Sequence, residues 1–400
     1  MWTKILPLSL VLASAALPAQ TYPEALAAAR RSDPIYAQRR GDVELERLQA
    51  RQARLAYLPG VGIGYRESDI GNSAWTTEAT LTQPIFDYDR ILQVRQGRPL
   101  AQRADATART VEQDLAQRVY RSMATIVLAR ETLRALAVQI QNLEGQTQRA
   151  KRMRELGQGT VTEVSDFEVR LASARANQQK TVNDLHSAER AFILLTGLEP
   201  QAEKIDVDAV FPQDALQARE WYRSEAQRSN PTLEQARRTL ELAEINLRRS
   251  RAEYLPKVTG VVSYGKTEGF PAGDDARIGV NLAVPLDANY LLSNSRAGVE
   301  LRRAQDAARY ASEFVVNETE RLYATVLSLQ REVAIREQVI TNAQLAVEGN
   351  LKGYQGGIRS NTDVVTAIQN LADAEVALVN SRLALAASFL DLEIVRGVTP

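Results

Sequence analysis

Two copies of a Tyr-Leu-Pro stretch decide the fold of this chain. The first is YLPGVGIGY at residues 57–65, and the second is YLPKVTGVVSY at residues 254–264, 197 positions later. In both copies the proline ends a helical pattern, because it lacks an amide hydrogen and restricts the preceding residue to extended conformations. Alternating apolar and small or polar residues follow at once, which is typical of a strand. The stretch therefore predicts a helix-to-strand junction that occurs twice.

The rest of the chain repeats in nearly the same register. Ser32-Asp33-Pro34 matches Ser229-Asn230-Pro231, Pro84-Ile85-Phe86-Asp87 matches Pro285-Leu286-Asp287, Thr162-Glu163-Val164 matches Thr362-Asp363-Val364, and Gly197 and Pro200 match Gly397 and Pro400. The offsets stay between 197 and 201 across a whole half, which indicates an internal duplication. We predict two structural repeats, residues 20–200 and 218–400, joined by a linker or equatorial segment at 201–217. Each repeat is expected to run helix, two strands, long helix, helix.

One helix of each repeat is predicted to be a rod of about 55–65 residues, which at 1.5 Å per residue reaches roughly 80–100 Å. These helices end near Gly157 in the first repeat and near Gly356-Gly357 in the second. Apolar residues recur along them at steps of three and four, as in a coiled coil: Ile126, Ala129, Leu133, Leu136, Ile140 and Leu143, then Leu322, Val326, Leu329, Val333, Ile340, Ala343 and Val347. The two shorter helices of each repeat, about 35 residues each, are expected to pack antiparallel beside the rod. Gly97-Arg98-Pro99 interrupts the first rod, where we expect a kink or a late helix start.

The composition argues against an enzyme. The 49 Lys and Arg balance 49 Asp and Glu, so no overall field attracts nucleic acid. The absence of cysteine excludes disulfides, thiolate metal sites and cysteine nucleophiles. The single histidine, His186, lies in a polar helical stretch, where a solvated surface residue is expected. We predict no catalytic residues, no metal, no cofactor and no nucleic-acid partner.

The N-terminus is similar to a secretory signal peptide. Lys4 precedes an apolar run from Ile5 to Ala16, and small residues follow, so residues 1–19 are predicted to be the signal. The run is shorter than the roughly 20 apolar residues of a membrane-spanning helix, and no later segment has such a run. The mature chain is therefore expected to leave the cytoplasm without a transmembrane helix.

The predicted strands have the alternation of membrane strands. In residues 277–286 the apolar positions are Ile278, Val280, Leu282, Val284 and Leu286. Strands of about 9–11 residues suit a tilted crossing of the bilayer. Four strands per chain cannot close a barrel, and an open edge in lipid leaves costly unpaired backbone groups. Three chains supply twelve strands, enough to leave a lumen. We therefore predict a mainly α fold whose helices form an α-barrel and whose strands complete a twelve-stranded barrel in a homotrimer.

These features resemble the TolC-type outer membrane efflux family, the outer membrane factors. The resemblance covers essentially the whole mature chain and lies in the Tyr-Leu-Pro stretches, the strand-end prolines followed by Asp87 and Asp287, and the turns at 157–164 and 354–364. It implies a barrel in the outer membrane and a helical tunnel in the periplasm. It also implies docking through a periplasmic adaptor (membrane fusion) protein to an inner-membrane pump or ABC transporter. The function implied is an exit duct for efflux of small molecules or for type I protein secretion.

The resemblance further implies a gate at the periplasmic constriction. The residues carried over by position are Thr162, Glu163, Tyr354, Arg359 and Asp363. Tyr354 and Arg359 are expected to face Thr162 and Glu163, and Asp363 to contribute to an acidic ring. An exposed pair such as Arg359 and Glu163 is worth about 0–1 kcal/mol, so three copies would close the tip weakly and reversibly. Thr366 stands where a second acid is expected one helical turn on, which weakens any cation site. The alternative is that all five are ordinary solvated turn residues.

Three other functions are compatible with parts of the pattern. A coiled-coil trimer could serve as a structural envelope spacer or anchor with little transport. A secreted hydrolase would need clustered acids or a nucleophile with a base, whereas the acids here are spread along helix faces. A soluble helical filament would need no detergent. The duct is the hypothesis that the strand count and the duplication favour.

Overall fold

The computed structural model describes residues 21–68, 74–200, 216–268, 272–285 and 290–399. The predicted signal peptide, most of the predicted linker and Asp287 lie outside the described residues. The chain divides into two compact units. Unit 1 comprises Met1–Asp33, Arg118–Asp214 and Ser328–Ala387; unit 2 comprises Pro34–Gln117, Ala215–Leu327 and Ser388–Pro400.

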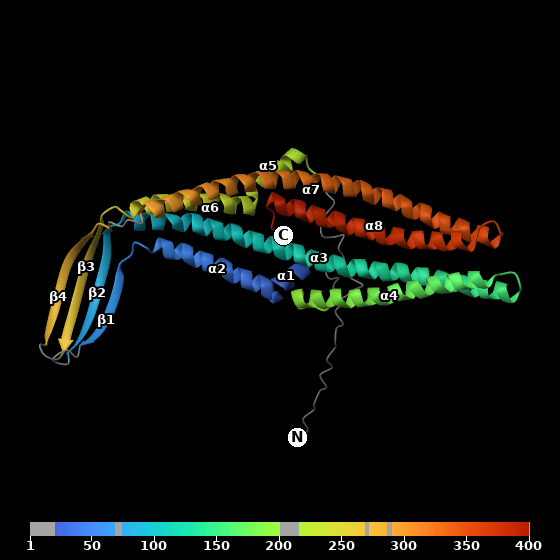
Figure 1. The fold of residues 1–400 in the computed structure, drawn as a ribbon, viewed down its shortest axis with the longest axis horizontal. Helices are drawn as coiled ribbons and strands as arrows, with labels where there is room; N and C mark the ends of the chain where they lie inside the picture. The colour runs from blue at the N-terminus through green and yellow to red at the C-terminus, as the bar shows by residue number, and fades with distance from the viewer. Residues whose placement is uncertain (1–20, 69–73, 201–215, 269–271, 286–289, 400) are drawn as a thin grey trace, which may run out of the picture. The chain divides into compact units, whose positions relative to one another are not determined.

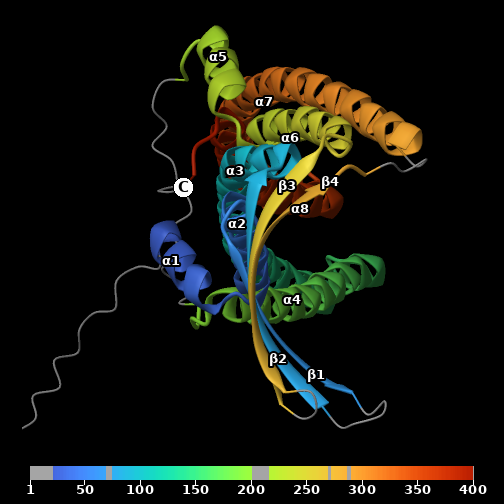
Figure 2. The same ribbon diagram turned by 90° about the vertical axis from the view of Figure 1, so that its left-hand side faces the viewer.

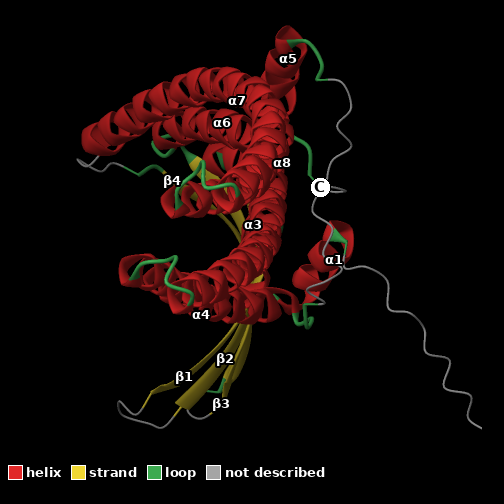
Figure 3. Ribbon diagram, turned by 90° about the vertical axis from the view of Figure 1, so that its right-hand side faces the viewer, coloured by secondary structure: helices red, strands yellow, loops and turns green. Residues whose placement is uncertain are grey.

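The order of elements is the same in both halves of the chain (Figure 1). The first half holds α1 (Tyr22–Ser32), α2 (Pro34–Arg54), β1 (Gly60–Ser68), β2 (Ala74–Phe86), α3 (Tyr88–Glu155) and α4 (Val161–Thr196). The second half holds α5 (Arg219–Ser229), α6 (Pro231–Ala252), β3 (Lys257–Glu268), β4 (Gly273–Ala283), α7 (Tyr290–Gln355) and α8 (Asn361–Arg396). The predicted fold class is confirmed, because helix dominates and the strands form one antiparallel sheet (Figure 3).

The long helices are slightly longer than predicted. Helix α3 has 68 residues and α7 has 66, while α4 and α8 have 36 each. The coiled-coil spacing was therefore a reliable guide to helix length. Among the described residues, no helix is both long and apolar enough to cross a membrane.

Unit 2 contains the sheet, whose strand order is β1-β2-β3-β4 with antiparallel neighbours throughout (Figure 1). Figure 2 shows the same sheet from its side, where the strands overlap. The register places Val61 opposite Leu81, Leu81 opposite Val262, and Val262 opposite Ile278. Because side chains alternate between faces along a strand, this row and the rows two residues away share one face. The helical part of the unit has its own small core, which includes Ala226, Leu233, Ala311 and Val315.

Unit 1 consists of two helical hairpins and α1. In the α3–α4 hairpin the core contains Leu143, Val164 and Phe167, the last of which has no exposed surface. Residues in register on the two helices also form ion pairs, such as Arg175 with Glu144 at 2.6 Å. Polar contacts also hold the hairpin of α7 and α8: the Ser381 hydroxyl donates to Glu332 at 2.9 Å, and Arg382 pairs with Glu337 at 2.7 Å.

One expected helix is two helices, so that prediction was wrong. The first helix was expected to be continuous up to Tyr57, but it breaks at Asp33, which has extended backbone angles before Pro34. The second repeat breaks in the same way at Asn230. The residue before a proline avoids the helical region, and Asn230 caps the new helix by accepting a hydrogen bond from the amide of Leu233 at 3.0 Å. The repeated Ser-Asp-Pro and Ser-Asn-Pro triplets mark the positions of these two helix breaks in the sequence.

Gly97-Arg98-Pro99 does not delay the helix. Helix α3 begins at Tyr88 and continues through Pro99. The glycine has a packing role, because a β-carbon at Gly97 would lie 2.5 Å from Cγ of Arg54 and 3.0 Å from the carbonyl oxygen of Ala50. The absence of a side chain thus lets α2 approach α3 closely within unit 2.

Candidate functional site: the paired turns and the two-faced sheet

The turns that end α3 and α7 in unit 1 share one backbone geometry. Gly157 and Gly357 both have positive φ, 73° and 72°. The residue after each glycine donates its amide hydrogen to the carbonyl five positions earlier: Gln158 to Met153 and Ile358 to Gly353, both at 2.8 Å. This is the hydrogen-bond pattern of a glycine-terminated helix end, and it satisfies carbonyls that would otherwise lack a partner. Both turns are therefore sharp and reproducible in shape.

The helices that follow each turn begin with a capping box. The amide of Glu163 donates to Oγ1 of Thr160 at 3.2 Å, and the Glu163 carboxylate accepts from the Thr160 amide at 3.0 Å. Asp363 and Ser360 repeat the arrangement at 3.2 and 2.9 Å. These reciprocal bonds satisfy amides at the helix start. Glu163 and Asp363, two of the predicted gate residues, thus stabilise helix starts. Sequence reasoning missed this role, although Thr-x-x-Glu and Ser-x-x-Asp are recognisable capping-box patterns.

Asp363 is electrostatically stabilised as a carboxylate. Hydrogen bonds from the amide and hydroxyl of Ser360, together with the nearby charge of Arg359, hold the pKa of Asp363 below its ordinary value. Asp363 is partly exposed, and these contacts account for the lowering because burial by itself would raise the pKa of a carboxyl group. A permanent negative charge therefore stands at the N-terminus of α8, where the helix dipole also favours it.

The structure brings Tyr354 toward Glu163. Partial burial, and secondarily the negative charge of Glu163, raise the pKa of the Tyr354 hydroxyl. Thr162 is exposed on the first turn of α4. Within one chain, over the residues that the structure describes, Arg359 makes no ion pair with Glu163; its stem instead lies over Gly353, where a β-carbon would be 2.6 Å from Arg359 Cγ. The expected pair of Arg359 and Glu163 is therefore not formed within the described single chain.

A groove of about 770 Å³ runs between α7 and α8 beside the second turn. Its wall includes Arg359, Asp363 and Thr366. Asp373 lies further along the same wall and accepts a hydrogen bond from Gln369 at 2.9 Å. Sequence reasoning did not single out Asp373 as a residue of this groove. In the described ranges, no group of three or more His, Cys, Asp or Glu side chains could hold a metal ion.

The sheet of unit 2 has one strongly apolar face that is open to the surroundings. Ile278 is 87% exposed, Ile63 80% and Val61 74%. These residues and Leu282 share a face in the observed register. The opposite face carries glycines and polar side chains such as Glu78 and Arg277. An apolar surface of this extent is uncommon on a monomer in water and indicates contact with lipid or a partner.

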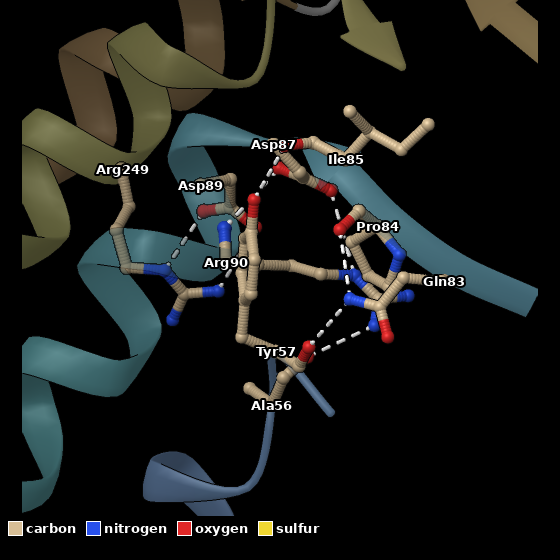
Figure 4. A network of polar contacts seen from close by, with 9 residues as sticks. All are labelled: Ala56, Tyr57, Gln83, Pro84, Ile85, Asp87, Asp89, Arg90 and Arg249. Atoms are coloured by element: carbon tan, nitrogen blue, oxygen red, sulfur yellow. Dashed lines mark hydrogen bonds and ion pairs between the residues drawn. The ribbon is translucent and has the colours of Figure 1, made fainter. Parts of the chain in front are cut away.

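A polar network fixes the junction between β2 and α3 in unit 2 (Figure 4). Oδ1 of Asp87 accepts from the amide of Arg90 at 3.2 Å and so caps the long helix. The Arg90 guanidinium donates to the carbonyl of Ala56 at 3.0 Å, and the Tyr57 hydroxyl donates to the carbonyl of Ile85 at 2.8 Å. Hydrogen bonds thus connect the Tyr-Leu-Pro stretch directly to the Pro-x-x-Asp stretch at this junction.

Arg249 of α6 secures the start of α3 from the other side. Its guanidinium binds both carboxylate oxygens of Asp89, at 2.8 and 3.3 Å, and donates to Gln96 at 2.9 Å. A two-bond contact of this kind fixes orientation as well as distance. The direction in which strands leave the helices is therefore held by side chains, not by the backbone alone.

Comparison with known proteins gives consistent matches over nearly the whole chain. A family model described as "Outer membrane efflux protein" matches residues 25–198 and again residues 222–397. The outer membrane protein TolC of Vibrio cholerae is 24% identical over an alignment 420 positions long, covering 97% of this chain and 94% of that protein. The alkaline protease secretion protein AprF of Pseudomonas aeruginosa is 22% identical over 347 residues, covering 83% and 71%. The crystal structure of the outer membrane protein VceC of Vibrio cholerae aligns with a TM-score of 0.79 at 19% identity, covering 94% of this chain and 96% of that one.

Proposed function

The chain belongs to the outer membrane efflux protein family and is an outer-membrane exit duct, and we propose that it works as a homotrimer coupled to a transport system of the inner membrane. In this proposal the four strands of each chain contribute to a twelve-stranded barrel in the outer membrane. The helices of three chains continue the lumen through the periplasm.

The observation that carries the proposal is the sheet with two unpaired edges and an open apolar face. Within the described residues, β1 and β4 each have a neighbour on one side only. In lipid, every unpaired backbone amide and carbonyl costs several kcal/mol, so these edges need strands from other copies. Eight strands from two copies would fill their own interior, whereas twelve from three leave room for a lumen. Exposed apolar side chains on α7, such as Ile335 at 60% and Leu345 at 63%, offer further surface to neighbouring subunits.

The transported material divides into two classes. AprF is by name a protease secretion protein, and TolC of Vibrio cholerae by name an outer membrane protein. For this chain we propose export of small molecules or type I secretion of a protein, through a periplasmic adaptor and an inner-membrane pump or ABC transporter. The duct would work without catalysis, cofactor or nucleic acid, because an open lumen needs none of them.

We also propose that the paired turns of unit 1 form the gate. The contributing residues are Thr162, Glu163, Tyr354, Arg359 and Asp363. Two features support this role: Tyr354 lies near Glu163 within the chain, and Arg359 is held over its turn without an ion pair to Glu163. Arg359 would then meet Glu163 of a neighbouring subunit. We further propose that residues 1–19 are removed as a signal, and that residues 20–200 and 218–400 are duplicated repeats flanking the segment 201–217.

Single-channel recording tests the proposed function. The mature chain, extracted from outer membranes in detergent, is expected to migrate as an oligomer that dissociates on heating. In planar bilayers it should show small conductance, which rises when Glu163→Gln and Arg359→Met are combined. A trimer that stays without conductance in this double variant would support a structural envelope spacer or anchor instead.

A further inference from the structure

The two hairpins of the sheet have the same register once the repeat offsets are applied. The Tyr-Leu-Pro stretches set an offset of 197 between β1 and β3, and the strand-end prolines set an offset of 201 between β2 and β4. Applied to the pair of Gly60 and Thr82, these offsets give Lys257 and Ala283. That is the pair the structure forms. The duplication therefore preserves strand pairing residue for residue.

A β-bulge explains why the prolines, rather than the aspartates behind them, set the offset of the second strands. Pairing in β2 passes from Pro84 to Phe86 and skips Ile85. The second repeat has Pro285-Leu286-Asp287 in place of Pro84-Ile85-Phe86-Asp87, which is one residue shorter. The extra residue of the first repeat lies beyond the proline, so it does not disturb the offset along the paired part of the strand.

The pairing of β2 with β3 shows how one repeat meets the next. In a closed ring of equivalent repeats, the same contact must recur where β4 of one chain meets β1 of its neighbour. We propose that β4 and the neighbouring copy's β1 pair in the register obtained by transferring the β2–β3 register through the two offsets. The pair of Leu81 and Val262 then becomes Leu282 with Tyr65 of the neighbouring copy. This inference rests on the proposed function, because it presupposes the closed trimer.

The two faces of the sheet support this register independently. Leu282 and Tyr65 both lie on the apolar face and are 64% and 65% exposed in the single chain. A slip of one residue would place Asn281 opposite Tyr65 and would turn one strand's apolar residues toward the lumen. The offset of 200 that the aspartates suggest would produce that slip. A slip of two residues keeps the faces matched, so only an experiment can separate it from the proposed register.

Because the chain has no cysteine, engineered pairs can report the register without background. We would combine Leu282→Cys with Tyr65→Cys and oxidise the detergent-extracted protein with copper phenanthroline. Within one chain, Leu282 and Tyr65 lie on opposite edge strands, three strand spacings or roughly 14 Å apart across the sheet. The row of Tyr65 reaches β4 at Asp274, and Leu282 lies eight positions further along that strand, so the full separation is larger still. A disulfide between them must therefore link two chains. Non-reducing electrophoresis should show covalent dimer and trimer bands that reduction converts to monomer.

Matched variants control for register and for disulfide chemistry. Leu81→Cys with Val262→Cys is the equivalent pair within one chain and should oxidise without linking chains. Leu282→Cys with Ile63→Cys, and Leu282→Cys with Glu67→Cys, are slipped by two residues. Cα atoms at such diagonal positions lie about 7–8 Å apart, at or beyond the limit for a disulfide. We expect the proposed pair to yield at least about tenfold more covalent trimer than either slipped pair.

Light scattering of the cysteine-free protein measures whether it is a trimer in detergent. This distinguishes a wrong strand register from a wrong proposed function. A trimer in which a slipped pair forms the covalent product, or in which no pair does while Leu81→Cys with Val262→Cys oxidises, overturns the register and leaves the proposed function standing. A monomer in detergent overturns both. A trimer cross-linked at Leu282→Cys with Tyr65→Cys supports the register.

Discussion

The turn after α3 and the turn after α7 have nearly the same backbone but different side chains above it. In the first turn a β-carbon at Gly159 would lie 3.1 Å from the backbone nitrogen of Arg154 and 3.2 Å from Cβ of Met153. In the second turn the sizes are exchanged, because Arg359 lies over Gly353. The first turn thus has Met153 where the second has Gly353, and the second has Arg359 where the first has Gly159.

This exchange lets the two turns keep one backbone shape while only the second carries a charged side chain over its glycine. The glycine ends and capping boxes supply the shared shape. The charge of Arg359 and the hydroxyl of Tyr354, which correspond to Gly159 and Arg154 in the first turn, supply the difference. We therefore expect substitutions of shared residues to act equally in the two turns, and substitutions of the exchanged residues to act unequally.

The largest expected effect is on the conductance of the closed duct. Arg359→Met keeps a long chain over Gly353 and removes the charge, so a gate held by Arg359 should open more often. Each contact is worth up to about 1 kcal/mol, so the three symmetric contacts of a trimer together correspond to a change of up to roughly 100-fold in open probability. Single-channel recording in planar bilayers measures it. Met153→Ala in the first turn is the matched control and should leave conductance unchanged; equal effects of the two variants would contradict an asymmetric gate.

Next in size is the cost of a side chain at the left-handed glycines. Gly157→Ala and Gly357→Ala each force a β-carbon into a positive-φ conformation, at about 1–2 kcal/mol, and nothing else lies within 4 Å of either position. Hydrogen exchange of the turn amides should speed up by similar factors in both variants. Clearly different factors would mean that the two turns are not energetically equivalent.

The capping boxes should give a smaller effect that is again equal in the two turns. Thr160→Ala and Ser360→Ala each remove the side-chain acceptor for an amide at a helix start, at about 1 kcal/mol. Faster exchange of the first amides of α4 and α8 would measure this loss. Glu163→Gln retains an acceptor for the Thr160 amide and should leave exchange nearly unchanged, so an equal loss there would point to charge rather than capping.

The smallest expected effect is a dependence of the stability of the α8 N-terminus on pH. The pKa of Asp363 is lowered in the folded chain, so its carboxylate contributes stability that is complete above the unfolded-state pKa and is lost as pH falls through the lowered folded value. Exchange protection of the start of α8, corrected for the intrinsic rate, should be constant from pH 7 to about pH 5 and decline below about pH 4. Asp363→Asn should abolish this decline; a loss centred above pH 5 would contradict the assignment.

Much of this fold could be predicted because its signals are long and periodic. Steps of three and four along Ile126 to Leu143 and the period-two alternation of residues 277–286 report packing that the chain itself creates. Prolines were harder to interpret. Pro34 and Pro231 divide helices, whereas α3 continues through Pro99. Asp33 and Asn230, which precede Pro34 and Pro231, have side-chain oxygens that can cap a new helix. Arg98, which precedes Pro99, has no such acceptor.

The candidate site was only partly accessible from sequence. The positions of Glu163 and Asp363 on the turns followed from the resemblance, but their capping bonds and the placement of Arg359 over Gly353 depend on backbone angles set by Gly157 and Gly357. Contacts between subunits depend on a second chain. The sequence of one chain therefore does not specify these contacts in general. The sheet edges are the exception, because the internal repeat allows the strand register within one chain to be applied to the proposed contact between chains.

We propose above all that three copies of this chain close a ring around a lumen. Electron-microscopic projections of the detergent-extracted mature protein, together with its mass by light scattering, test it most directly. We expect end-on views with threefold symmetry and a protein mass of three chains. A particle with the mass of one chain that stays dispersed without detergent would contradict the account.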